Sequence, residues 1–543
     1  MELASLLASL SSELIYQIVD YSCPYTILAL ALTCSTLHHR FKPILEQHRN
    51  AYNKHRVSSD LSPETVLALL KDGPSAKIER WHIRELEIWG SREGWEDWRS
   101  WVPDLPSAYG LAEEDPSRSA LSIPELQRCI RKGIDFWEFS GDDIDEVQQN
   151  LESGSDAYLK LLLIASCPRL QSIRFVKRPY DTWSSLLWIE RGIKWSKSND
   201  KWPPGFKSLQ NVAVGISTGL LPHEDEDKSV HCAVLAALLY LPRLKNLYFC
   251  EPFQNKEEEE EEEDFEFHEW YDFPTNTSSV ESLFLDSPCN LSCECYDAIA
   301  SAPKELETLV IRARTSTVHN VDEVDSLTSA LYYESPQLKR FAVYNGAGFY
   351  GQVGPYPCFS AEDKRFQSIK LFSVAASALE ECSYDNSDDP YQAPKFIRDE
   401  RIYGALPSAM EAMYVWGPTA LHKNEDEPSE ALDSLLARII ESGAYQDLKV
   451  IYVENVESAQ SESDPVIAGR KEPAFQKTLA AGRKAHVHVC TLMNNYDGGY
   501  WKNFPAKPDR FDLKTGPCGK RPADWKLNLY TGEWVPQRLA SEI

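Results

Sequence analysis

Three cysteines near the middle of the chain have a spacing that could bind a metal. Cys289, Cys293 and Cys295 follow the pattern C-x3-C-x-C, and cysteine thiolates are common zinc ligands in tetrahedral sites. A second pair of ligands at the usual spacing is missing, and only Cys250 and His268 could add to the set if the fold brought them close. Packed, reduced thiols are the favoured interpretation, so we predict no metal and no cofactor.

A second candidate lies near the C-terminus, where His486, His488 and Cys490 alternate with Val487 and Val489. Alternation with a period of two places the three polar side chains on one face of a strand, where they could form a metal or catalytic face. No local motif supplies a serine or aspartate partner, and the chain has no G-x-G-x-x-G, Walker A or H-E-x-x-H sequence. We interpret these residues as polar, half-buried positions of a final strand at 486–490. No catalytic residue is predicted, and the chain is not expected to be an enzyme.

Two charged stretches could also serve as binding sites, but neither matches a known motif. Asp142, Asp143, Asp145 and Glu146 suggest calcium, but the central glycine and terminal glutamate of an EF-hand loop are missing, so a solvated loop and helix start are predicted. The second stretch is basic and consists of Lys502, Lys507, Arg510, Lys514, Lys520, Arg521 and Lys526. It would pair with the acidic body of the chain or contact an acidic or phosphorylated partner.

The composition bounds the functions that these residues can serve. The chain has 543 residues and a formal net charge of −27, which repels nucleic-acid backbones, so nucleic acid is not expected as a partner. It has no apolar run of about 18 residues and no secretory signal with a basic start, so no membrane association is expected. The thirteen cysteines are scattered, as in a cytoplasmic and/or nuclear protein with reduced thiols.

A recurring apolar pattern predicts the elements that would position any site. One apolar residue is followed by a second three residues later and a third two residues after that, and the last two alternate with other residues as in a strand. The instances are Ile83/Leu86/Ile88, Leu170/Ile173/Phe175, Leu209/Val212/Val214, Leu244/Leu247/Phe249, Val280/Leu283/Leu285, Leu306/Leu309/Ile311, Leu338/Phe341/Val343, Ile369/Phe372/Val374, Met410/Met413/Val415 and Leu448/Ile451/Val453.

An amphipathic helix ending at a proline or glycine precedes many of these predicted strands. The predicted helices are Tyr158–Ala165, His231–Tyr240, Tyr296–Ser301, Leu327–Tyr333 and Leu432–Ile440. The residues that stop them are Pro168, Pro242, Pro303, Pro336 and Gly443. Helix, breaker and strand therefore repeat along the chain, which is typical of proteins built from stacked units.

The repeated unit resembles that of leucine-rich-repeat proteins, although its spacing is irregular. Successive starts from Leu170 onward lie about 26 to 41 residues apart, against roughly 20–29 in regular repeats, with insertions near 251–275, 345–362 and 383–398. We predict an α/β fold in which helix and strand alternate along an irregular leucine-rich-repeat-like solenoid. A Trp-rich stretch, Trp89–Trp101, would cap its start, and the C-terminus would close its end. An unrelated α/β fold is the structural alternative.

The first 45 residues predict three short helices with strongly apolar faces. Ser11 or Ser12 would cap the first helix, Pro24 suits the first turn of the second, and Ser35 would cap a third that Pro43 interrupts. A helical module of this size cannot cover its own apolar faces, so a partner or a neighbouring domain should do so. A connecting helix is predicted at residues 63–70.

These N-terminal residues resemble an F-box, the module with which one subunit of a ubiquitin ligase binds the Skp adaptor. The family opens on Leu-Pro-x-Glu-Leu-x-x-x-Ile, matched here by Leu10, Glu13, Leu14 and Ile18, while Leu28, Leu30, Leu32 and Cys34 match its middle and Leu37 to Leu45 its end. Ser11 departs from the family, which has proline there. The resemblance implies adaptor contacts for Leu10, Glu13, Leu14, Ile18, Leu28 and Leu32.

The resemblance implies a non-catalytic, substrate-recognition subunit of a Skp–cullin–F-box ubiquitin ligase. Its F-box would bind the Skp adaptor, and through it a cullin and a RING subunit, while the repeats would bind an unknown protein substrate. The alternatives are a leucine-rich-repeat interaction scaffold without a ligase link, and an enzyme on an unrelated α/β fold. The predicted parts are the F-box-like module at 1–48, a linker helix at 49–78, the repeats at 79–490 and a cap or tail at 491–543.

Overall fold

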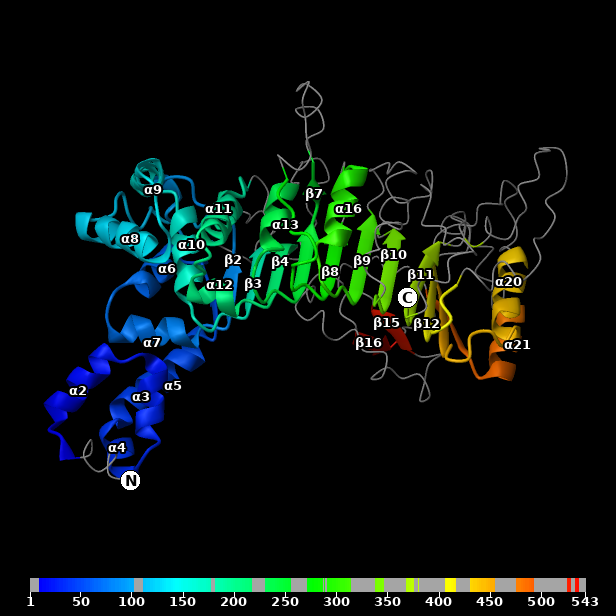
Figure 1. The fold of residues 1–543 in the computed structure, drawn as a ribbon, viewed down its shortest axis with the longest axis horizontal. Helices are drawn as coiled ribbons and strands as arrows, with labels where there is room; N and C mark the ends of the chain where they lie inside the picture. The colour runs from blue at the N-terminus through cyan, green and yellow to red at the C-terminus, as the bar shows by residue number, and fades with distance from the viewer. Residues whose placement is uncertain are drawn as a thin grey trace, which may run out of the picture. The chain divides into compact units, whose positions relative to one another are not determined.

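The computed structural model describes residues 9–101, 111–176, 181–216, 230–254, 271–286, 288, 291–313, 337–345, 368–375, 379, 406–416, 430–454, 475–492, 525–528 and 533–536. The chain divides into two compact units. Unit 1 comprises residues 1–228 and 240–244, and unit 2 comprises residues 229–239 and 245–543. Both units are mixed α/β, and their main strands run parallel (Figure 1). The predicted four-part division of the chain stays a prediction.

Unit 1 begins with four short helices, which we call the N-terminal module. They are α2 (Ser12–Tyr21), α3 (Pro24–Ala31), α4 (Ser35–Arg40) and α5 (Lys42–His55). Ser11 caps α2, because its hydroxyl accepts a hydrogen bond from the backbone N of Leu14 at 3.5 Å. Pro24 occupies the first turn of α3. Both features confirm the predicted starts of these helices.

The third predicted helix differs in detail. Helix α4 begins one residue earlier than predicted, because Cys34 rather than Ser35 is the extended residue before its first turn. Pro43 lies in the first turn of α5, and the chain turns at Phe41 between α4 and α5. The predicted interruption is therefore confirmed, since proline is tolerated only in the first turn of a helix.

The N-terminal module leads into two strands and two connecting helices. These elements are β1 (Val57–Ser59), α6 (Pro63–Leu70), α7 (Pro74–His82) and β2 (Glu85–Ile88). Helix α6 matches the predicted connector. Strand β1 was not predicted, because its three residues are too short to show a period. It pairs with β2 and forms the edge of the sheet. The backbone N of Trp101 donates to the carbonyl of Leu61, just after β1, at 2.7 Å, and the capping role of the Trp-rich stretch stays a prediction.

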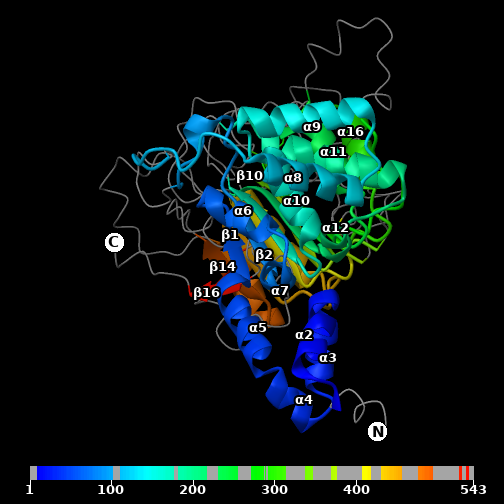
Figure 2. The ribbon, with the colours of Figure 1, turned by 90° about the vertical axis from the view of Figure 1, so that its left-hand side faces the viewer.

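The rest of unit 1 packs helices around a central one. The elements are η1 (Trp95–Asp97), α8 (Ile123–Phe136), α9 (Gly141–Ser153), α10 (Ala157–Ser166), β3 (Ser172–Val176), α11 (Ser184–Ser198), α12 (Pro204–Ser208) and β4 (Asn211–Ile216). Helix α10 contacts α6, α8, α9, α11 and α12 (Figure 2). Every residue from Ala157 to Ala165 is consequently buried. The prediction of an amphipathic helix here was wrong, because α10 has neighbours on all sides.

Unit 2 carries the remaining strands and the helices between them. Its elements are β5 (Val230–His231), α13 (Cys232–Leu238), β6 (Asn246–Cys250), β7 (Pro252–Phe253), β8 (Ser282–Asp286), α16 (Cys293–Ser301), β9 (Thr308–Ala313), β10 (Arg340–Asn345), β11 (Leu371–Ala375), β12 (Ala412–Trp416), α20 (Glu430–Glu441), β13 (Val450–Glu454), α21 (Gln476–Ala485), β14 (His488–Leu492), β15 (Trp525–Asn528) and β16 (Glu533–Pro536). Strands β6, β8 and β9 to β14 lie side by side in chain order, and Figure 1 shows β8 to β12 in this order.

The apolar pattern sets the register of the strands. In unit 1, Ile173 pairs with Leu86 on one side and with Val212 on the other. In unit 2, Leu309 pairs with Leu283 and with Phe341 in the same way. The second apolar residue of each pattern therefore stands next to its counterpart on the adjacent strand. All ten predicted strands are confirmed, and the core of each sheet consists of these stacked apolar residues.

Two C-terminal predictions change. The final strand begins at His488, two residues later than predicted, because His486 ends α21 in a left-handed conformation with φ of 60°. Of the predicted C-terminal cap, the structure describes the antiparallel pair β15–β16. The predicted helix at 327–333 and the greater part of the predicted insertions lie outside the described residues.

Candidate docking surface on the N-terminal helices

The N-terminal module builds a small core of its own. Helix α2 buries Ile15 and Val19, and α3 buries Ile27 and Ala31. In each helix the two residues are four positions apart and so lie on one face. Leu37, Phe41, Ile44 and Ala51 from α4, its end and α5 complete this core, together with Ile78 from α7. The prediction that the module cannot cover its apolar faces is therefore only partly right.

A second apolar stripe runs beside the buried one on both helices. On α2 it consists of Leu14 and Ile18, each one position before a buried residue. On α3 and its C-cap it consists of Leu28 and Leu32, each one position after a buried residue. Leu14 is 47% exposed and Leu32 is 79% exposed, whereas Ile18 and Leu28 are half-buried. We call these four residues the outer stripe. The module thus carries more apolar surface than its own core uses.

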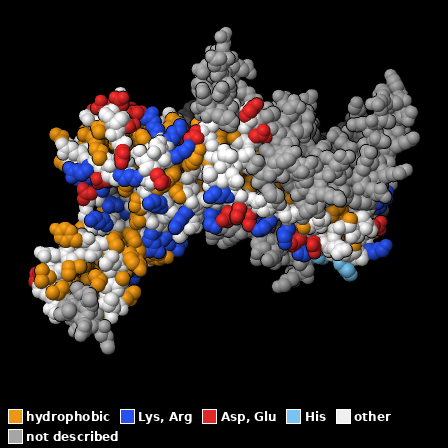
Figure 3. All heavy atoms as spheres, in the orientation of Figure 1, with side chains coloured by type: hydrophobic (Ala, Val, Ile, Leu, Met, Phe, Trp, Pro, Cys, Tyr) orange, Lys and Arg blue, Asp and Glu red, His pale blue; other side chains and the backbone are white. Residues whose placement is uncertain are grey.

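Exposed aromatic residues extend this apolar surface. Tyr21 at the end of α2 is 93% exposed and Tyr25 at the start of α3 is 68% exposed. Figure 3 shows hydrophobic side chains gathered over the N-terminal module. Contiguous exposed apolar surface is typical of a binding site, whereas scattered single residues are not. The two tyrosines were not singled out from the sequence, although tyrosine is a frequent anchor of protein interfaces.

The remaining predicted adaptor contacts lie at the start of α2. The side chain of Leu10 is half-buried and packs against the module core, and its carbonyl accepts a hydrogen bond from Arg40 Nη1 at 2.6 Å. Glu13 is exposed in the first turn, where hydrogen bonds from its own backbone N–H and from the hydroxyl of Ser11 lower its pKa. The start of α2 therefore presents a carboxylate beside the exposed Leu14.

Helices α5 and α7 pack against each other through a buried pair of histidines. His48 Nδ1 and His82 Nε2 are 3.0 Å apart, and the rings of His48 and Trp81 form a T-shaped pair with their centroids 5.7 Å apart. Burial, and then the neighbouring His48, lower the pKa of His82 to about 4, and burial also lowers the pKa of His48. Both rings are therefore neutral at pH 7, and their contact is part of the packing between α5 and α7.

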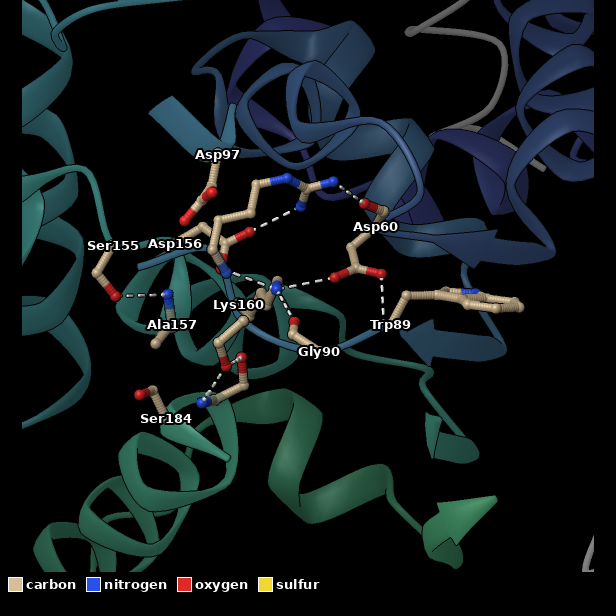
Figure 4. A network of polar contacts seen from close by, with 12 residues as sticks. Asp60, Trp89, Gly90, Asp97, Ser155, Asp156, Ala157, Lys160 and Ser184 are labelled. Atoms are coloured by element: carbon tan, nitrogen blue, oxygen red, sulfur yellow. Dashed lines mark hydrogen bonds and ion pairs between the residues drawn. The ribbon is translucent and has the colours of Figure 1, made fainter. Parts of the chain in front are cut away.

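A cluster of four buried charges lies deeper in unit 1, around α10. Lys160 Nζ forms ion pairs at 2.8 Å with both Asp60 and Asp156, and Arg92 Nη1 pairs with Asp156 at 2.8 Å (Figure 4). Burial alone would raise the pKa of Asp156, but the charges of Lys160 and Arg92 outweigh it, so this pKa lies below its ordinary value. The backbone N of Trp89 donates to Asp60 at 2.7 Å.

This buried cluster holds structure together and cannot reach a substrate. The four side chains are at most 2% exposed, and the two positive charges balance the two negative ones. Arg92 also donates to the carbonyls of Asp60 and Leu61, each at 3.1 Å. Sequence analysis missed the cluster, although one signal existed: Lys160 is a single charge within the apolar run of α10. A lysine in such a run must find a buried carboxylate.

The residues predicted as possible metal ligands or catalytic groups do not assemble. Cys250 and Cys295 are buried free thiols, whereas Cys289, His268 and the side chain of Cys293 lie outside the described part of the chain. His486 caps α21 and is exposed, so it does not share a strand face with His488. Among the described residues, no three metal-binding side chains come together.

The charged stretch at 142–146 begins a helix, as predicted. Asp143 and Ser140 form a capping box at the start of α9, with Ser140 N donating to Asp143 Oδ2 at 2.8 Å. Asp142 and Asp143 thus stand in the first turn, where the helix dipole favours negative charge. Of the basic C-terminal stretch, only Lys526 falls within the described residues, on β15.

Comparisons with known proteins leave the chain without an assigned family. No protein-family model matches it, and no curated protein gives a significant match. Within the described residues, none of the helices has both the length and the apolar character that crossing a membrane requires. The function must therefore be inferred from the residues and surfaces of the chain.

Proposed function

We propose that this protein is a non-catalytic, substrate-recognition subunit of a Skp–cullin–F-box ubiquitin ligase. The observation that carries the proposal is the outer stripe: Leu14 and Ile18 on α2, and Leu28 on α3 with Leu32 at its C-cap, lie beside the module core instead of in it. The residues that resemble the F-box pattern therefore include four that the module does not need for its own core. A partner with an apolar groove would cover them.

The two-stripe arrangement suits docking onto an adaptor. Leu14 and Ile18 are four residues apart, and so are Leu28 and Leu32, so each pair forms a continuous edge along its helix. Helices that lay such a face into a hydrophobic groove are a common mode of protein recognition. The carboxylate of Glu13 and the exposed Tyr25 at the helix starts would add polar and aromatic contacts at the rim.

The remainder of the chain would recognise the target protein. We propose that the helix–strand units form an irregular leucine-rich-repeat-like solenoid, whose exposed residues bind a substrate protein. The parallel strands in register, each carrying the same apolar pattern, support this proposal. The chain would then act by holding the target near a conjugating enzyme carried by the cullin–RING subunits.

Binding of the Skp adaptor to the purified full-length chain tests the proposal. The test variant is Leu14→Asp with Leu32→Asp, because both side chains are exposed and neither belongs to the module core. We expect its Kd for the adaptor to rise at least about a hundredfold, since each leucine would become a charge inside an apolar interface. Isothermal titration calorimetry gives the Kd.

Two residues on other helices of unit 1 provide a matched control. Leu187 on α11 is 46% exposed and Ile123 on α8 is 72% exposed, close to the values for Leu14 and Leu32. Leu187→Asp with Ile123→Asp should bind the adaptor as the unchanged chain does. Absence of adaptor binding by the unchanged chain would refute the ligase proposal and favour an interaction scaffold without a ligase link. Equal weakening in both double variants would refute the outer stripe as the docking surface.

A further inference from the structure

Within each unit, the residues just before neighbouring strands form a backbone ladder, which runs along β1 to β4 in unit 1 and along β6 and β8 to β13 in unit 2. In unit 2, Glu307 N donates to the carbonyl of Glu281 at 2.8 Å, and Lys339 N donates to that of Glu307 at 2.9 Å. In unit 1, Arg84 N donates to the carbonyl of Arg56 at 3.0 Å, and Gln171 N to that of Arg84 at 2.8 Å. We call these residues the rungs.

The rungs of unit 2 pair opposite charges. Lys245 Nζ lies 2.7 Å from Glu281, and Lys339 Nζ lies 2.5 Å from Glu307. Further along, Glu411 pairs with lysines on both sides, Lys370 at 2.7 Å and Lys449. In ladder order these rungs are Lys245, Glu281, Glu307, Lys339, Lys370, Glu411 and Lys449, so every glutamate has a lysine rung next to it. Figure 3 shows acidic and basic side chains mixed along this edge. Each of these carboxylates compensates one or two lysines.

The rungs of unit 1 carry no acidic residue. They are Arg56, Arg84, Gln171 and Gln210. A third arginine, Arg169, stands two residues before the Gln171 rung. None of the three arginines forms a salt bridge with a carboxylate of the described residues, in contrast to Arg92, Arg118 and Arg174 of the same unit. Glu85 attracts Arg56 weakly and also lies 3.6 Å from Arg174.

The three arginines stand close together around two aromatic rings. Arg169 and Arg84 lie over the ring of Trp81, with their guanidinium carbons 4.2 Å and 5.7 Å from its centre. Arg56 Nη1 lies 3.4 Å from the hydroxyl of Tyr52. This hydrogen bond, and then the charges of Arg56 and Arg84, lower the pKa of Tyr52. The rings therefore hold the guanidinium groups in place without neutralising them.

Positive charge is concentrated here in an otherwise acidic chain. Arg84 is half-buried, and burial followed by the repulsion from Arg169 lowers its pKa to about 10. Such repulsion is relieved when an anion binds, because the guanidinium fork donates two parallel hydrogen bonds to a phosphate or carboxylate. Arg56 and Arg169 are exposed, so an anionic group can reach them from solvent.

We propose that Arg56, Arg84 and Arg169 form a binding site for an anionic group on a polypeptide, either a phosphorylated side chain or clustered carboxylates. Arg84 stands between the other two, with its Nη1 held by the carbonyls of Trp81 and Ile83 at 2.9 Å and 3.0 Å. The two exposed arginines close on the anion from either side. Binding at this site requires neither the adaptor nor the outer stripe.

Fluorescence anisotropy with the full-length chain tests this site. Three labelled peptides of otherwise identical Gly-Ser sequence are compared, with phosphoserine, with two aspartates, or with unmodified serine at the centre. The test variant is Arg56→Gln with Arg169→Gln, which leaves the half-buried Arg84 in place. We expect the Kd of the phosphoserine peptide to rise at least about fivefold in this variant, and its binding to weaken with added salt.

Arg131→Gln with Lys194→Gln is the charge-matched control, since it also removes two positive charges and both side chains are exposed, on α8 and α11. It should leave the Kd of the phosphoserine peptide unchanged. Comparison of the phosphoserine and aspartate peptides shows which anion the site prefers, and binding of either one supports it. Equal binding of all three peptides, or an equal response of the test variant and the control, would overturn the proposal. Either result leaves the adaptor measurement unaffected, because that measurement concerns α2 and α3 alone.

Discussion

The N-terminal module and the centre of unit 1 depart from the usual arrangement of side chains in opposite ways. The module leaves Leu14 and Leu32 in solvent, whereas the centre buries Lys160 and Asp156 completely. Exposed apolar groups are stabilised only when something else covers them, while buried charges are stabilised by partners already present. The first departure therefore points outward to a binding partner, and the second points inward to a closed structural cluster.

The charged residues just before the strands also differ between the two units in whether the chain itself compensates them. In unit 2 the rung lysines lie beside glutamates, so their charge is compensated within the chain. In unit 1 the arginines at 56, 84 and 169 lie beside aromatic rings and each other. A charged side chain that has no opposite charge beside it within the chain is the better candidate for binding a partner. Three predictions, beyond those for the adaptor and the anionic peptide, test this distinction.

Replacement of Lys160 has the largest expected effect. Lys160→Met should destabilise unit 1 by about 3–5 kcal/mol, because Asp60 and Asp156 would remain buried with one cation fewer. Urea unfolding followed by circular dichroism measures the loss. Lys194→Met is the control, since Lys194 is an exposed helix lysine paired with Glu190, and it should cost less than about 1 kcal/mol. Similar losses in both variants would show that the buried cluster is not structural.

Acidification should loosen the packing of α5 against α7. The pKa of His82 is about 4, below its ordinary value of 6.5, so the folded state binds fewer protons than the unfolded state. Stability is thus fully present above pH 6.5 and declines as the pH falls from 6.5 toward 4. After a discount for partial solvent access, this histidine accounts for about 1–2 kcal/mol of that decline.

His82→Phe removes the titration while keeping an aromatic ring beside Trp81. Between pH 7 and pH 4.5, this variant should lose about 1–2 kcal/mol less unfolding free energy than the unchanged chain does. Urea unfolding at several pH values provides the measurement. His38→Phe serves as the control, because His38 is exposed on α4. If His82→Phe lost as much unfolding free energy on acidification as the unchanged chain, His82 would not be the source of the pH dependence.

The smallest effect is expected at Ser11, where the chain departs from the F-box pattern. Its backbone φ of −64° and ψ of 156° are angles that proline also adopts. Ser11→Pro loses a long cap hydrogen bond but stiffens the unfolded chain, so stability should change by less than about 1 kcal/mol. Thermal unfolding and adaptor titration provide the readouts. A large loss of adaptor binding in Ser11→Pro would show that the adaptor requires the serine. It would contradict the proposal that the outer stripe is the main determinant of adaptor binding.

Much of the fold could be predicted from short patterns. The ten strands follow from the spacing of three apolar residues, as in Leu306, Leu309 and Ile311, because a parallel strand buried on its core face needs that alternation. Strand β1 and helices α8 and α11 escaped prediction. They depend on contacts with distant segments, such as the pairing of Val57 with Glu85, which local periodicity does not contain.

The candidate sites were harder to predict than the strands. The pattern at Leu14 and Leu28 indicated an apolar face, but it did not say which of two adjacent stripes would be buried. Arg84 and Arg169 are separated by more than eighty residues, and only the pairing of β2 with β3 brings their surroundings together. The motifs with metal-like spacing, by contrast, attracted attention without assembling into a site among the described residues.

The order and spacing of apolar residues were enough to determine where the strands begin and that they stack in register, because each strand must present its own buried face. Tertiary structure alone decided which charges are compensated and which apolar residues stay uncovered, because both depend on neighbours far away in the chain. Lys160 finds two carboxylates within the fold, whereas Arg169 finds a tryptophan and another arginine. Leu32 finds no cover within the module core, and that leaves it available for a partner.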